Sequence, residues 1–224
     1  MQNELVPAKR GTFLRKNGNE ELEISLDRKD LGKIFLINEV NFKTEDISKT
    51  DLIIEPYSYY MIINKGNEEI ELFYSLNISD HEIVYNPYKY ENGEKVNFQP
   101  DKFKQRFHVP EGYIDTLPKW YSFKFTYNDY NLIFVKPEMG LSIQKHNSRN
   151  ETWEILEGNP IIINGNKVYY NAKNGSKFQI PIDTYHSIIN SNKEANKFVL
   201  LKERWSGNFD ENDITRVFNP NNYK

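Results

Sequence analysis

The stretch of sequence that decides the fold is residues 141–153, LSIQKHNSRNETW. Gln144 and His146 lie two residues apart, so on a strand their side chains share one face. A polar turn follows, and Glu151 begins the next strand candidate directly beside them. An amide oxygen, an imidazole and a carboxylate on one face are suitable donors for a divalent metal. The stretch therefore predicts a metal site built on two neighbouring strands.

A second imidazole comes from later in the chain. His186 opens a strand candidate after a bend at residues 181–185, PIDTY. Because the chain has no cysteine, any metal must be held by nitrogen and oxygen ligands. We expect a divalent metal, zinc first with manganese, iron or nickel as alternatives, and the expected ligands are Gln144, His146, Glu151 and His186.

Short apolar or alternating runs fill residues 113–224, and Asn-Gly turns separate them at 164–166 and 174–176. Asn-Gly between alternating runs is a strong hairpin signal. Many short strands with regular turns favour an antiparallel sandwich or barrel. Residues 210–218 alone suggest a helix in this half, with Asp210 as its N-cap.

Composition excludes several classes of function. The absence of cysteine rules out a disulfide scaffold, an iron–sulfur cluster and a thiol nucleophile. A net charge of -3 gives no electrostatic case for nucleic acid or an acidic membrane surface. The mean hydropathy is -0.74, and no apolar run is long enough to span a membrane. The polar first residues do not resemble a secretory signal, so we expect a cytoplasmic protein.

The Pro/Gly punctuation at 109–112, VPEG, suggests a domain boundary. Residues 113–224 are expected to form the metal-binding domain. Residues 1–112 read as a β-rich N-terminal region of unassigned role, which would pack on the barrel or mediate a homodimer.

Two spaced motifs resemble those of cupins. Residues 144–158, QKHNSRNETWEILEG, match the first cupin motif except that glutamine replaces its first histidine. Residues 175–190, GSKFQIPIDTYHSIIN, match the second, with Asp183 replacing a turn glycine. The resemblance implies an all-β fold, the cupin double-stranded β-helix or jelly-roll barrel. The alternative is a degenerate bicupin, in which residues 107–110, FHVP, are a remnant of a second motif.

A narrower resemblance covers residues 116–218. Residues 141–146 are similar to the Leu-Ser-[Leu/Ile]-Gln-x-His of phosphomannose isomerases, which use the glutamine as a metal ligand. Residues 149–153 resemble the Arg-Ala-Glu-His-Trp of the type II form, and residues 211–216 resemble its closing Glu-Asp-Asp-Ile-x-Arg. Ser148 departs from the family, which has a further histidine there.

This resemblance implies a metal-dependent isomerase that interconverts mannose 6-phosphate and fructose 6-phosphate, or a related phosphorylated or nucleotide-linked sugar. The expected partner is a small phosphorylated sugar, with no nucleic acid and no membrane. Arg216 matches the family's late arginine and is the expected catalytic residue. Further candidates for anion binding are Lys136, Lys202 and Arg204.

The sequence does not assign the general base. Glu203 is the available carboxylate on a late strand, but strand parity places it on the face opposite Lys202 and Arg204. Two other functions remain open as well. One is an iron-dependent cupin oxygenase, because two histidines and a carboxylate can support oxygen chemistry. The other is a non-catalytic cupin that binds metal and sugar.

Overall fold

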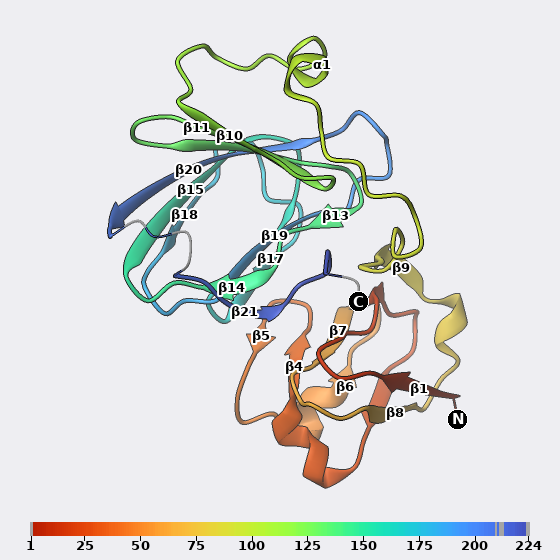
Figure 1. The fold of residues 1–224 in the computed structure, drawn as a ribbon. Helices are drawn as coiled ribbons and strands as arrows, with labels where there is room; N and C mark the ends of the chain where they lie inside the picture. Colours follow the sequence, from red (N-terminus) through yellow and green to blue (C-terminus); the bar gives the residue numbers. More distant parts are fainter. Residues whose placement is uncertain (1, 209, 211–212, 223–224) are drawn as a thin grey trace. The chain divides into compact units, whose positions relative to one another are not determined.

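The computed structural model of the chain describes residues 2–208, 210 and 213–222. Short β-strands, paired antiparallel, are its main regular secondary structure, as Figure 1 shows. The chain divides into two compact units, Met1–Asn86 with Gly165–Val168, and Pro87–Asn164 with Tyr169–Lys224. The all-β class predicted from the sequence is confirmed.

The strands of the first unit are β1 (Gln2–Val6), β2 (Leu14–Lys16), β3 (Leu22–Ser25), β4 (Ile34–Ile37), β5 (Phe42–Lys43), β6 (Ile53–Ile54), β7 (Tyr59–Asn64), β8 (Ile70–Tyr74) and β9 (Glu82–Tyr85). Short 3-10 helices lie at Arg28–Lys33, Lys49–Leu52 and Ile78–Asp80. The strands form two sheets, ordered β1-β8-β3-β6 and β5-β4-β7-β2-β9. In β3, Leu22 and Ile24 are buried while the residues between and after them are exposed, so one face of the sheet supplies the core.

The elements of the second unit are α1 (Pro100–Lys104), β10 (Asp115–Pro118), β11 (Ser122–Thr126), β12 (Asn131–Val135), β13 (Met139–Gly140), β14 (Ile143–Lys145), β15 (Arg149–Glu157), β16 (Ile161–Asn164), β18 (Lys177–Ile180), β19 (His186–Asn190), β20 (Val199–Gly207) and β21 (Thr215–Phe218). Strand β17 (Lys167–Tyr169) lies where the chain leaves the short segment of the first unit.

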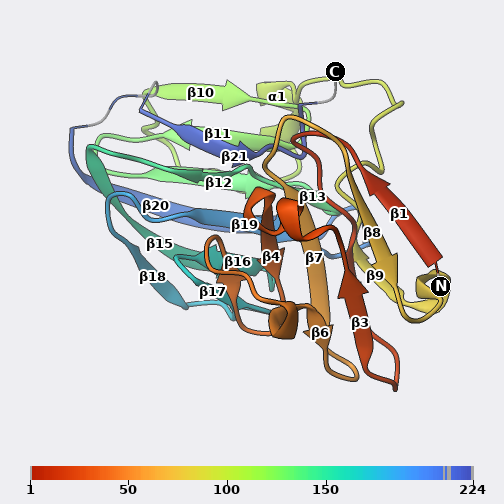
Figure 2. The ribbon, with the colours of Figure 1, turned by 90° about the horizontal axis from the view of Figure 1, so that it is seen from below.

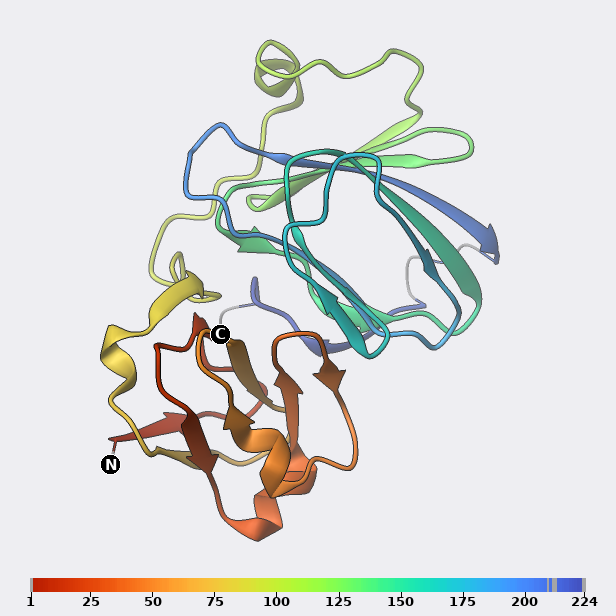
Figure 3. The same cartoon turned by 180° about the vertical axis from the view of Figure 1, so that it is seen from behind.

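Two antiparallel sheets form the second unit. One is ordered β10-β11-β12-β20-β15-β18, and the other contains β16-β19-β14-β21, with β13 also pairing with β19. Figure 2 shows β12, β20, β15 and β18 following one another across the first of these sheets. Seen from behind in Figure 3, the green to blue strands of this unit curve around a common interior. This is the two-layered jelly-roll arrangement.

Strand parity decides which side chains reach that interior. On β15, Glu151, Trp153 and Ile155 are buried, and the residues that alternate with them are more exposed. On β20, Leu201 and Glu203 are buried, and Glu203 lies directly opposite Trp153 in the ladder. The pattern that builds the hydrophobic core therefore also carries two carboxyl groups inward.

Tight turns hold the motif residues at the expected places. Gly158 and Gly175, the glycines of the two spaced motifs, have φ values of 86° and 82°. A Cβ at Gly158 would also approach Val199 Cγ2 to 2.8 Å. Asp183 replaces a turn glycine and itself adopts a φ of 57°, a left-handed conformation that aspartate tolerates better than most residues. The substitution therefore preserves the turn before His186.

The helix expected over 210–218 is wrong where the structure describes that segment; residues 211–212 lie outside the described residues. Thr215–Phe218 form strand β21, which pairs with β14, with Arg216 opposite Gln144. Pairing with β14 satisfies the backbone hydrogen-bonding groups of this segment, and this tertiary contact outweighs the local helical preference.

Along the chain, the first unit's long segment ends at Asn86 and the second unit begins at Pro87, so residues 87–112 belong to the second unit. A functional domain boundary near residue 112 stays a prediction, as does the role of the N-terminal region. Among the described residues, no helix is long and apolar enough to cross a membrane.

Candidate metal and substrate site

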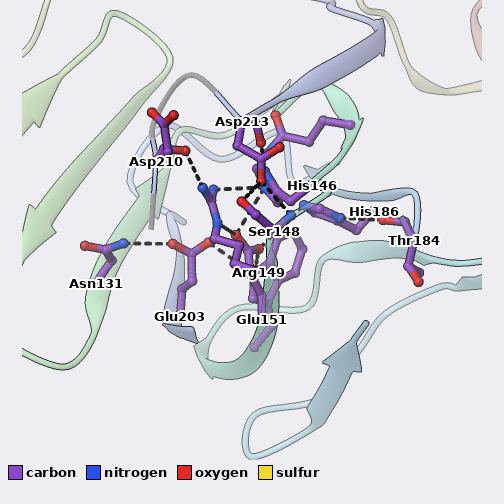
Figure 4. Close-up of polar contacts among 12 residues, drawn as sticks. Asn131, His146, Ser148, Arg149, Glu151, Thr184, His186, Glu203, Asp210 and Asp213 are labelled. Atoms are coloured by element: carbon purple, nitrogen blue, oxygen red, sulfur yellow. Dashed lines mark hydrogen bonds and ion pairs between the residues drawn. The ribbon is translucent and has the colours of Figure 1, made fainter. Parts of the chain in front are cut away.

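Three of the four predicted metal ligands converge in the second unit. His146 follows β14, Glu151 lies on β15, and His186 begins β19. One ligand atom from each lies within 4.8 Å of the others, and all three side chains are buried. His146 Nε2 is 3.2 Å from Glu151 Oε1, and His186 Nε2 is 3.5 Å from Glu151 Oε2. Figure 4 shows the two imidazoles beside the carboxylate.

Hydrogen bonds to the backbone orient both imidazoles. His146 Nδ1 bonds to the Asp213 carbonyl oxygen, and His186 Nδ1 bonds to the Thr184 carbonyl oxygen at 2.9 Å. Since a carbonyl only accepts, each Nδ1 carries a hydrogen, and the Nε2 atom of each ring lies on the side that faces Glu151. Histidine ligands of metals usually have this second hydrogen bond to a carbonyl or carboxylate.

The three residues fit a divalent metal. Two imidazole nitrogens and a carboxylate oxygen lie close together, and these are donors that zinc and similar divalent metals use. His186 Nε2 is buried and has no hydrogen-bond partner. The pKa of Glu151 is low, about 2: burial would raise it, but the imidazoles of His146 and His186 and the guanidinium of Arg149 oppose burial. The carboxyl group is therefore ionised, as metal ligation requires.

Gln144, the fourth predicted ligand, lies on β14 between two other site residues. It is paired in register with His186 on one side and Arg216 on the other. Its Oε1 accepts a hydrogen bond from Ser142 Oγ at 2.7 Å. Its role as a ligand stays a prediction.

A cavity of about 530 Å³ lies beside this cluster. Its wall includes four cationic side chains and one carboxyl group: Lys119, Lys124, Arg149, Arg216 and Glu203. Gln144 and Trp153 also line it. Because cations outnumber the carboxyl group, the cavity suits an anionic ligand.

Of the residues predicted to bind an anion, one lines the cavity and three do not. Arg216 lines the cavity, whereas Lys136, Lys202 and Arg204 are not among its lining residues. Lys202 Nζ lies 4.0 Å from the centre of the Tyr130 ring, and Arg204 is exposed. On β20 these two side chains alternate with Glu203, which does line the cavity. Their role in substrate binding stays a prediction.

Glu203 is buried and held by two donors. Asn131 Nδ2 donates to its Oε1 at 2.8 Å, and Trp153 Nε1 donates to its Oε2 at 3.2 Å. Burial, followed by the negative charge of Glu151, raises the pKa of Glu203 to about 7. Such a carboxyl group can accept and release a proton near neutral pH.

Sequence reasoning missed the role of Asp213. Besides its carbonyl contact with His146, its carboxylate accepts hydrogen bonds from Ser148 Oγ at 2.5 Å and from the backbone N–H of Ser148 at 2.9 Å. Asp213 therefore fixes the turn that carries His146. The available signal was the closing motif at 211–216, where this aspartate stands three residues before Arg216.

Comparisons with known proteins identify the family of the chain. A family model described as "Mannose-6-phosphate isomerase C-terminal" matches residues 98–219, more than half of the chain. No curated protein matches the chain.

Several solved structures resemble parts of the chain. A protein from Photorhabdus luminescens is 22% identical over 42% of this chain and 66% of its own, with a TM-score of 0.31. A cupin sugar phosphate isomerase from Silicibacter pomeroyi is 13% identical, covering 43% and 76%, with a TM-score of 0.33. The nucleoside dehydratase Pac13 of Streptomyces is 12% identical, covering 50% and 93%, with a TM-score of 0.38.

The family match spans both spaced motifs, and the described residues of those motifs form the buried cluster in a jelly-roll barrel. The chain therefore belongs to the mannose-6-phosphate isomerase C-terminal family of cupins.

Proposed function

We propose that the protein is a metal-dependent sugar-phosphate isomerase. Its substrate would be mannose 6-phosphate or fructose 6-phosphate, or a related phosphorylated or nucleotide-linked sugar. The observation that carries this proposal is the cavity, because cationic side chains and the buried carboxyl group of Glu203 line it beside the His146–Glu151–His186 cluster.

The cluster would hold the metal. His146, Glu151 and His186 would supply two imidazole nitrogens and a carboxylate oxygen. We propose that Gln144, which pairs with His186 in the sheet, adds an amide oxygen. When bound, a divalent metal polarises sugar oxygens and stabilises the negative charge that develops during isomerisation. We expect zinc, with manganese, iron or nickel as alternatives.

Glu203 is our candidate for the general base. Aldose–ketose isomerisation moves a proton from C2 of the aldose to C1, while a second proton passes from the C2 hydroxyl to the C1 oxygen. An ionised Glu203 would take the proton from C2 and return it to C1. Asn131 and Trp153 each donate a hydrogen bond to one of its oxygens, and these two bonds hold the carboxylate in one orientation.

Arg216, Lys119 and Lys124 are our candidates for binding the phosphate group. All three line the cavity, and they come from different elements: β21, the β10–β11 turn and β11. A guanidinium can bind two phosphate oxygens at once, and a lysine adds a point charge. We would mutate these three residues before Lys202 and Arg204. The side chains of Lys202 and Arg204 are on the face of β20 opposite to Glu203, and they do not line the cavity.

The test is a panel of sugars assayed with protein of measured metal content. We expect turnover of a hexose 6-phosphate, loss of that turnover on chelation, and its return when metal is added. The unphosphorylated sugar should react far more slowly. Metal-loaded protein that binds hexose phosphate without converting it would support a sugar-binding cupin instead.

A further inference from the structure

Arg149 occupies an unusual place for a cation. Its side chain is 5% exposed and lies against the cluster that would bind a metal cation. Nε donates to Glu151 Oε1 at 2.9 Å, and Nη2 donates to His146 Nε2 at 2.9 Å. Nη1 donates to the Asp210 carbonyl oxygen at 2.8 Å. Figure 4 shows the guanidinium between Asp210 and the two ligand residues.

The two atoms of the cluster that Arg149 contacts, His146 Nε2 and Glu151 Oε1, are both able to bind a metal. The Nε2 lone pair of His146 can be shared with one partner at a time, because His146 Nδ1 already holds the ring hydrogen. A metal–nitrogen bond is about 2.0–2.1 Å long, so a metal on that lone pair would replace the guanidinium hydrogen bond. Two cations so close together would also repel each other.

Arg149 also connects the cluster with the cavity. Arg149 and Trp153 both line the cavity and both contact Glu151. His146, Glu151 and His186 are at most 2% exposed and are not among the lining residues. Arg149 therefore lines the cavity and also contacts two atoms of the buried cluster.

We propose that Arg149 is a built-in counter-cation that holds the metal-free cluster together and competes with a divalent metal for His146 Nε2 and Glu151 Oε1. The inference rests on the metal site of the proposed function and is independent of the substrate. Without metal, the guanidinium balances the buried Glu151 charge; with metal, it leaves these two atoms. Breaking a buried ion pair from one side is strongly destabilising, so the metal-free protein depends on Arg149.

The experiment is a zinc titration of chelator-treated protein, followed by calorimetry, comparing wild type with Arg149→Met. Methionine keeps much of the length of the side chain and removes the competing charge. We expect the variant to bind zinc at least 10-fold more tightly. In chelator its melting temperature should fall below that of wild type, and saturating zinc should remove most of the difference. Arg106→Met, which changes an exposed arginine bonded to Asn196, is the matched control and should change neither quantity.

If Arg149→Met bound zinc with the same affinity as wild type or more weakly, the proposal that Arg149 competes with the metal would be overturned. Zinc binding by neither protein would instead contradict the metal site on which the proposed function rests. If Arg149→Met does not fold in chelator, Arg149→Lys provides the second arm. Lysine keeps the charge but cannot donate to both atoms through a planar fork. We then expect tighter zinc binding than in wild type, and unchanged affinity would overturn the proposal.

Discussion

Glu151 and Glu203 accept hydrogen bonds from the same indole N–H. Trp153 Nε1 lies 3.1 Å from Glu151 Oε2 and 3.2 Å from Glu203 Oε2. The environments of the two carboxyl groups move their pKa values apart, to about 2 for Glu151 and about 7 for Glu203. Such a separation is typical of sites that use one carboxylate as a fixed charge and another to move a proton.

The first prediction concerns the pH dependence of turnover. Glu203 must be ionised to act as a base, so kcat/KM should rise with pH through the pKa of Glu203. A metal on Glu151 adds positive charge nearby, which favours ionisation, so the midpoint should lie at or below 7. Pre-steady-state or steady-state rates across pH 5–9 would measure it. A profile that is flat between pH 5 and 8 would assign the base elsewhere.

The second prediction is that Glu203→Gln lowers kcat by about 10²–10⁴-fold, the usual contribution of a general base. Bound metal should be retained because Glu203 is not one of the cluster residues. Glu154→Gln is the matched control, since Glu154 is on β15, outside the cluster and the cavity lining. Equal rates for the two variants would exclude Glu203 from proton transfer.

The third prediction concerns stability. Burial raises the pKa of Glu203 from its ordinary 4.5 to about 7, so the folded state holds this proton more tightly than the unfolded state. The associated stability is present below the unfolded pKa and is lost as pH rises toward 7. Because glutamine cannot ionise, the metal-free Glu203→Gln variant should have a higher melting temperature than metal-free wild type at pH 8 but not at pH 5. If wild type instead had the higher melting temperature at pH 8, the folded state would favour the ionised form of Glu203.

The fourth prediction tests the metal ligands. His186→Ala removes a buried imidazole whose Nε2 has no hydrogen-bond partner, and we expect the purified protein to lose both metal and turnover. His108→Ala, at an exposed position of the same unit, should retain both. Metal content can be measured by mass spectrometry of the digested protein. Full metal content in His186→Ala would mean that the metal is held elsewhere.

The fifth prediction separates the two sets of cations. Lys124→Met and Lys119→Met should raise KM for the phosphorylated sugar about 10-fold because both side chains line the cavity. Lys202→Met and Arg204→Met should raise KM less, because these two side chains are on the face of β20 opposite to Glu203 and do not line the cavity. A larger increase in KM for the Lys202 or Arg204 variant would support the sequence-based prediction that these residues bind the phosphate. It would contradict our proposal that the cavity lysines do so.

The all-β class and the convergence of His146, Glu151 and His186 could be predicted from local patterns and from the resemblance of the two spaced motifs to those of cupins. The short alternating runs indicate strands, and the spacing of His146, Glu151 and His186 reflects strand and turn lengths. Strand parity also separated Glu203 from Lys202 and Arg204. It could not say which face is inner, because that depends on the register of β20 with β12 and β15.

The contacts of Arg149 and Asp213 could not be predicted in this way. Arg149 donates to the Asp210 carbonyl, and Asp213 orients His146 from 67 positions along the chain. Such contacts depend on where the closing segment crosses the barrel. The predicted helix over 210–218 failed for the same reason, since β21 is stabilised by pairing with β14.

The most direct test of the proposed isomerase is to follow mannose 6-phosphate by NMR in the presence of protein whose bound metal has been measured. We expect conversion to an equilibrium mixture with fructose 6-phosphate, and no conversion by Glu203→Gln over the same period. Metal-loaded wild type that leaves mannose 6-phosphate and the other hexose phosphates unchanged would contradict the proposed isomerase function.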